Sequence, residues 1–146
     1  MLIVENDYVQ HLEYAWRAFG TDFWNTSELG DHGIGLKYYR PLVTISYLVN
    51  YLMAGGSAWV FHLTNVLLHG GVVYLSVRIG QRWLKSTTLA IFAAAIFALH
   101  PTRAESVVWI AGRTDVLMAL FALASVRSLQ LALDSVSRQA RSRWLS

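Results

Sequence analysis

The chain has 146 residues, of which 55% are hydrophobic and only 14% are Asp, Glu, Lys or Arg. An ordinary soluble domain carries about 25% charged residues, so this composition excludes that class and indicates an integral membrane protein. The formal charge of +3 does not indicate nucleic-acid binding, because the basic residues lie at the edges of apolar segments and in the C-terminal tail.

Residues 1 to 40 are predicted to form an extracytoplasmic loop segment. Up to residue 37 they hold six acidic residues against two basic ones, with aromatic residues between them. The stretch from 25 to 35 is rich in glycine and small polar residues, which is typical of a loop. Because the N-terminus is acidic where a signal peptide would have a basic start and an apolar run, no cleavable signal is predicted.

A membrane helical region is predicted from 41 to 127. Pro41 suits the first turn of a helix, but the apolar run that it opens ends at about Met53, before two glycines. Crossing a bilayer takes roughly 20 residues, so this first helix is predicted to be interfacial or half inserted. Three membrane-spanning helices are expected to follow, at 58–77, 86–99 and 106–126.

The bias of Lys and Arg toward cytoplasmic loops gives the orientation. Three basic residues lie in the loop from 78 to 85, and the chain from 127 onward has four against the single acid Asp134. The loop and the polar tail, 128–146, are therefore predicted to be cytoplasmic. The N-terminal segment and the turn from His100 to Glu105 then lie on the opposite, extracytoplasmic side.

Three polar residues of the first predicted span, His62, Asn65 and His69, share one helix face at spacings i, i+3 and i+7. Hydrogen bonding between helices is the ordinary role of such groups in bundles, and lining a substrate path is the alternative. A metal site needs three or more ligands. Two histidines are too few and the chain has no cysteine, so no metal site is predicted from these residues. No cofactor is predicted either, and the sequence leaves the use of a divalent metal open.

The segment from 100 to 115, HPTRAESVVWIAGRTD, places Arg113 and Asp115 inside an apolar helix. At about 100° per residue, Arg113 would share a face with Glu105. Each charge costs about 2.5 to 3.5 kcal/mol on insertion, so these side chains need partners or an aqueous cavity. Two interpretations stay open: an ion pair of Arg113 with Glu105 or Asp115, or an extracytoplasmic cavity where Arg113 and Glu105 bind an anionic phosphate.

Two further positions belong to this hypothesis. Gly112, on the same predicted face as Arg113, would let another backbone or a lipid chain approach closely. Arg40 follows two tyrosines at the membrane surface and is a second candidate phosphate contact. Snorkelling of Arg40 to lipid headgroups explains its position equally well.

Five motifs follow one another along the chain: DFW (22–24), YYRPL (38–42), FHLTNVLLH (61–69), FALHP (97–101) and ESVVWIAGRTDVL (105–117). In this order they resemble the membrane domain of the TMTC family and its bacterial relatives, which join a GT-C type glycosyltransferase domain to tetratricopeptide repeats. The resemblance covers roughly residues 1 to 126 and implies an all-α integral membrane fold that is part of a GT-C domain.

The resemblance implies transfer of a mannose-like sugar from a polyprenyl-phosphate carrier to an extracytoplasmic acceptor, such as a protein Ser or Thr hydroxyl. The membrane would be a bacterial inner membrane or that of the endoplasmic reticulum, and no nucleic acid is involved. The lipid phosphate would leave, and a carboxylate would act as general base. The matching positions for binding the lipid phosphate are Arg40, His100, Glu105 and Arg113.

The chain departs from the family pattern at two places. The family has an acidic pair before a segment resembling LIVEND, in which this chain begins, so the general base is expected to be absent and the module incomplete. Arg103 stands where the family has a second histidine. The alternatives are a non-catalytic membrane subunit or lipid-binding scaffold, joined to partner membrane helices, and a truncated reading frame.

Overall fold

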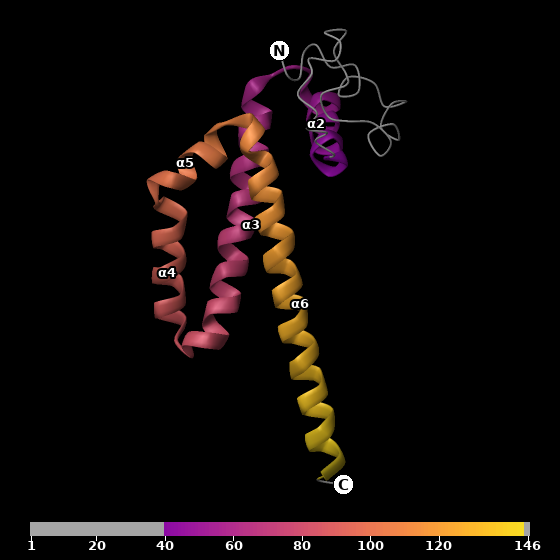
Figure 1. Ribbon diagram of the computed structural model, residues 1–146, viewed down its shortest axis with the longest axis vertical. Coiled ribbons are helices and arrows are strands. Elements are labelled where there is room, and N and C mark those ends of the chain that lie inside the picture. Colours follow the sequence, from indigo (N-terminus) through magenta and orange to yellow (C-terminus); the bar gives the residue numbers. More distant parts are fainter. Residues whose placement is uncertain (1–39, 145–146) are drawn as a thin grey trace, which may run out of the picture. The chain divides into compact units, whose positions relative to one another are not determined.

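The computed structural model describes residues 40 to 144, apart from the side chains of Ala104 and residues 138–144. This part of the chain is helical (Figure 1), as the apolar composition predicts. Two helices are long and apolar enough to cross a membrane, or three if the bent pair formed by 87–99 and 101–108 counts as one span. The chain divides into two compact units, Met1–Thr64 and Asn65–Ser146.

The first unit contains helix α2, Pro41–Ala54, and the first turns of α3, Ala58–Leu84. Pro41 occupies the first turn of α2, and the helix ends at Gly55, whose φ of 60° suits glycine. The prediction of a short apolar helix from Pro41 is confirmed. It packs on α3 through the Tyr47 and Phe61 rings, with centroids 6.2 Å apart.

Helix α3 extends to Leu84, beyond the predicted end at Val77, and turns into α4, Thr87–Leu99. Lys85 makes this turn with a φ of 51°, and Ser86 then caps α4 by accepting a hydrogen bond from the Leu89 amide. The two helices approach closely, because a Cβ built on Gly80 would lie 3.3 Å from the Cβ of Ala90.

The third predicted span, 106–126, is wrong as a single helix. Residues from Pro101 to Val108 form a separate helix, α5, at 57° to α4. Trp109 then has extended backbone angles (φ −77°, ψ 124°), and a 3-10 turn, η2, covers Ile110–Gly112. Helix α6 starts afresh at Arg113 and runs to Trp144, so the segment predicted as a polar tail continues this helix.

Within the second unit, α3 and α6 run side by side in the same direction, and α4 runs the opposite way (Figure 1). Contacts join α3 to α6 at both ends: Asn65 bonds Arg113, and Arg82 pairs with Asp134. Arg82, from the segment 78–85, and Asp134, from the chain after 127, therefore lie together at one end of this unit.

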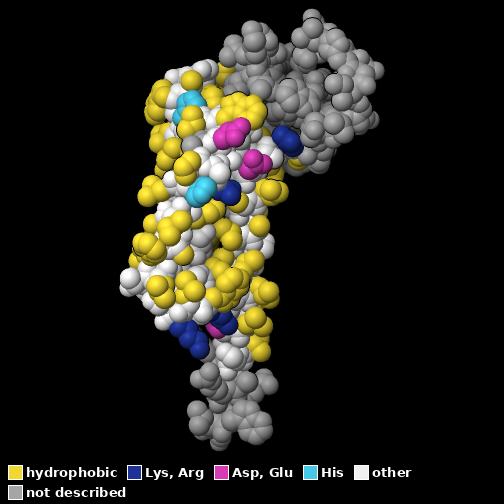
Figure 2. Space-filling view, turned by 60° about the vertical axis from the view of Figure 1, so that its left-hand side comes forward, with side chains coloured by type: hydrophobic (Ala, Val, Ile, Leu, Met, Phe, Trp, Pro, Cys, Tyr) yellow, Lys and Arg dark blue, Asp and Glu magenta, His cyan; other side chains and the backbone are white. Residues whose placement is uncertain are grey.

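The outer surface is mostly apolar. Large hydrophobic side chains of α3, α4 and α6, such as Leu67, Phe92 and Met118, are more than half exposed. Figure 2 shows hydrophobic side chains over much of one face, with Lys and Arg side chains at its lower end and at separate points higher up. Such a surface is typical of helices that face lipid or other membrane helices.

Candidate functional site

The break between α5 and α6 is held together by a buried amide. Asn65, on α3, has no exposed surface, and its Nδ2 donates to the carbonyl oxygens of Val107 and Trp109, each at 3.3 Å. A helix end leaves carbonyl groups without intrahelical partners, and a membrane interior offers no water to satisfy them. Asn65 therefore supplies partners for two carbonyls that the break exposes.

The same amide binds Arg113. The Nε of Arg113 donates to Oδ1 of Asn65 at 2.7 Å, and the arginine is fully buried. Arg113 also has further partners. Among the described side chains, neither Glu105 nor Asp115 is ion-paired with it, and both carboxylates are exposed. The expected helix face shared by Glu105 and Arg113 is wrong, because the extended backbone at Trp109 separates their helices.

Gly112 allows a very close approach of two backbones. A Cβ built on Gly112 would lie 2.5 Å from the carbonyl oxygen of Ser106 and 2.8 Å from its Cα. Real Cβ atoms essentially never lie within 3.0 Å of such neighbouring atoms. The sequence left open whether another backbone or a lipid chain lies close to Gly112. The structure shows that it is a backbone, that of Ser106 in α5. Gly112 thus lets the chain fold back onto α5 just before Arg113.

His100 directly precedes α5 and Glu105 lies on it, and both are on the surface of the second unit. His100 caps α5, because its Nδ1 accepts a hydrogen bond from the Thr102 amide at 3.3 Å. Since Nδ1 accepts, a neutral imidazole carries its proton on Nε2, so this nitrogen is a donor. Both side chains are exposed, and they offer a donor and a carboxylate at the same short helix.

A second contact group joins three helices through Phe97 of α4. The ring of His69, from α3, stacks on Phe97 with centroids 5.8 Å apart, and the guanidinium of Arg103, from α5, lies 5.0 Å from the centroid of Phe97. The contacts of Phe97 were not predicted from the sequence. The presence of this aromatic residue in one apolar segment and of His69 in another could have suggested that their rings stack. The stripe His62, Asn65 and His69 is divided: Asn65 is buried, and the two histidines are partly exposed.

Arg40 belongs to the first unit. It precedes α2 as its N-cap residue, and its side chain makes no capping hydrogen bond. Its carbonyl oxygen instead accepts from the amide and the hydroxyl of Thr44, at 3.1 and 3.2 Å. The residue is partly exposed and has a partner of its own. The predicted loop from 25 to 35 and the DFW motif lie outside the described residues.

No metal-ligating cluster occurs among the described side chains, where no three His, Cys, Asp or Glu residues gather. The chemically distinctive groups are a buried amide and guanidinium at a helix break. Together with the long apolar helices, they define the class as a helical membrane protein with a polar interior at one end.

Comparison with known proteins gives the family. The chain is 42% identical to protein O-mannosyl-transferase Tmtc2 of Drosophila melanogaster over 102 residues. It is 42% identical to Xenopus laevis tmtc2 over 115 residues and 36% identical to human TMTC4 over 118. These matches cover 68%, 78% and 71% of this chain. The chain is therefore homologous to the TMTC protein O-mannosyl-transferases.

The homology concerns a small part of those proteins. The matched regions make up 10% of the fly protein, 14% of the frog protein and 16% of human TMTC4. No family model matches the chain, and no solved structure matches it significantly. The resemblance predicted from the sequence motifs is confirmed by the relatives.

Proposed function

We propose that this chain forms part of a membrane O-mannosyltransferase that transfers mannose from a polyprenyl-phosphate carrier to a Ser or Thr hydroxyl of an extracytoplasmic protein. The observation that carries the proposal is Arg113, a buried guanidinium held by Asn65 in a chain homologous to protein O-mannosyl-transferases. A buried charge is costly, so a membrane helix that keeps one has a use for it.

Arg113 would act on the leaving phosphate. Its planar guanidinium has five N–H donors; the one on Nε donates to Asn65, and Arg113 also has further partners. Donors directed at the developing phosphate charge would lower the barrier to glycosyl transfer. His100 and Glu105 would contribute from α5, and Arg40 is a second candidate phosphate contact. The general base is not assigned; Asp22, Glu28 and Asp31, which lie outside the described residues, become candidates only if residues 1–146 alone transfer sugar.

A second candidate function also has a specific observation in its favour. Arg113 has no exposed surface, and its described bond is to Asn65, which also holds the backbone of the helix break. A lipid-binding or purely structural membrane subunit could use the same pair to fix α6 against α3. The two functions differ in one measurable property. In the transferase, the planar shape of the Arg113 guanidinium affects the affinity for a phosphate ligand; in a structural subunit it does not.

Binding of a short-chain polyprenyl-phosphate mannose to the chain in detergent tests this difference. We expect Arg113→Lys to weaken binding by about 10-fold or more, because lysine keeps the charge but loses the planar fork. Arg113→Leu should weaken it further. The control is Arg78→Gln, which removes an exposed arginine at the opposite end of α3 and should leave the affinity unchanged.

Melting temperatures measured on the same samples separate binding from folding. Unchanged affinity in both Arg113 variants would contradict the transferase proposal and favour the structural one. A loss of affinity that is fully explained by a smaller amount of folded protein would also contradict the transferase proposal. Absence of binding by the wild-type chain would count against the proposal in the same way.

We also propose a topology in which residues 1 to 40 are extracytoplasmic, 41 to 127 form the membrane region and 128 to 146 are cytoplasmic, in an endoplasmic reticulum or bacterial inner membrane. Reporters placed near Gln81 and after Ser146 are expected to lie in the cytoplasm, because the first lies within a basic segment and the second follows one. A tag between Gly30 and Gly35 should be reached only from outside. Labelling of that tag from the cytoplasmic side would contradict the proposed orientation.

A further inference from the structure

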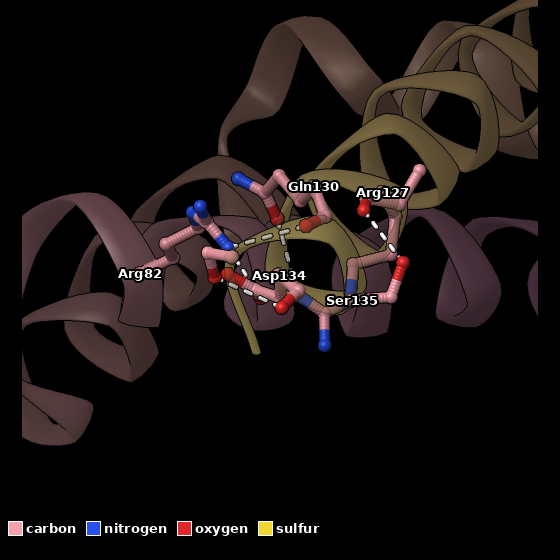
Figure 3. A network of polar contacts seen from close by, with 7 residues as sticks. Arg82, Arg127, Gln130, Asp134 and Ser135 are labelled. Carbon is pink, nitrogen blue, oxygen red and sulfur yellow. Dashed lines mark hydrogen bonds and ion pairs between the residues drawn. The ribbon is translucent and has the colours of Figure 1, made fainter. Parts of the chain in front are cut away.

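A polar network joins α3 to α6 at the end of the second unit opposite the helix break (Figure 3). Arg82 forms an ion pair with Asp134, and its Nη1 also donates to the carbonyl oxygen of Gln130 at 3.2 Å. One turn earlier on α6, Nη1 of Arg127 donates to Oε1 of Gln130 at 3.1 Å.

This network has more donors than acceptors. In these bonds each guanidinium uses Nη1, so Nε and Nη2 of Arg82 and Arg127 have no partner among the described residues. Gln130 is only 5% exposed, and its buried Nε2 likewise has no acceptor in the described part of the chain. A buried donor without an acceptor costs free energy. An anion with several oxygens would supply the acceptors that the described residues do not provide.

The position of the network indicates the source of that anion. Two more exposed cations, Arg78 and Lys85, lie on the same stretch of α3 and its following turn. Trp83, between them, is 70% exposed, as expected for an aromatic residue at a membrane interface. The network thus lies where two apolar spans end, at the level where lipid headgroups carry their phosphates.

We propose that Arg82, Arg127 and Gln130 form a binding site for the phosphate of an anionic phospholipid headgroup. A guanidinium matches a phosphate because it can donate two parallel hydrogen bonds to it. The carboxylate of Asp134 competes with the phosphate for Arg82, so it lowers the affinity of the site for the lipid. This site is separate from the helix break and does not depend on mannose transfer.

The test is titration of the full chain in detergent with dioctanoyl phosphatidic acid, with the dissociation constant taken from the rise in melting temperature. Arg127→Gln should weaken binding about 10- to 100-fold, because it removes charge-assisted hydrogen bonds. Asp134→Asn should strengthen it about 2- to 5-fold, because it frees Arg82. The matched control is Arg103→Gln, which removes an exposed arginine from α5.

Two other ligands separate the sources of phosphate. Dioctanoyl phosphatidylcholine and inorganic phosphate, at the same concentrations, should each bind at least about 10-fold more weakly than phosphatidic acid. Equal binding of either one would overturn the proposal. So would an equal loss of affinity in Arg103→Gln and Arg127→Gln, or weaker binding by Asp134→Asn, because both would place the lipid elsewhere.

Discussion

Replacement of Gly112 by alanine is expected to lower the free energy of unfolding by about 2 to 3 kcal/mol, at the upper end of the effect of overpacking. The added Cβ would meet three backbone atoms of Ser106, at 2.5, 2.8 and 2.9 Å. A flexible side chain could move aside, but backbone atoms of α5 move only if the helix moves. Because Arg113 is the next residue, the same shift should disturb its bond to Asn65.

Chemical denaturation of the purified chain in a mild detergent measures this effect. The matched control is Gly70→Ala, because a Cβ at Gly70 would have no heavy atom within 4 Å and alanine is the better helix former. Gly70→Ala should leave stability unchanged or slightly higher. Equal stability of the Gly112→Ala and wild-type chains would mean that the backbone approach between η2 and α5 is not maintained.

The apolar segments could be predicted because a membrane demands long uncharged runs. The starts of α2 at Pro41 and of α3 at Ala58 agree with the expected positions. The end of α3 could not be placed, because charge marks where the hydrocarbon ends and not where a helix ends. Residues 78 to 84 contain basic residues that are good helix formers, so the helix continues through them.

The break at Trp109 could not be predicted for a different reason. The residues from Ser106 to Ile110 are compatible with a helix, and no proline interrupts them. What stabilises the break is distant in sequence: Asn65 supplies donors for the carbonyls of Val107 and Trp109. The spacing of residues within a single helix does not reveal these hydrogen bonds from another helix. The helix face expected for Arg113 was therefore wrong.

The segment beginning at His100 shows the opposite case, in which local sequence signals were sufficient but were interpreted as a turn. Pro101 at the first helical position and His100 as the cap are both typical of a helix start. The pairing of Arg82 with Asp134 was also not predicted, because these residues are far apart in the chain and lie on helices whose register the sequence does not define.

Replacement of Asn65 by leucine should be the most harmful single change at the helix break. It removes one hydrogen bond to the buried Arg113 and two to backbone carbonyls. With these groups left unsatisfied, the expected loss of unfolding free energy is about 2 to 4 kcal/mol. His62→Leu is the control on the same helix, since His62 makes no hydrogen bond to a described residue, and it should change stability by less than about 0.5 kcal/mol.

A double-mutant cycle identifies which of the three bonds dominates. If the bond from Arg113 Nε to Asn65 Oδ1 is the main one, Arg113→Leu in the Asn65→Leu background should cost much less than in the wild type, with a coupling energy of about 1.5 to 3 kcal/mol. Asn65→Asp keeps an acceptor for Arg113 but directs a carboxylate oxygen at the two carbonyls, so its stability should fall between the wild type and Asn65→Leu. A coupling energy near zero would mean that Asn65 serves the carbonyls of the break alone, because Arg113 would then be held by its other partners.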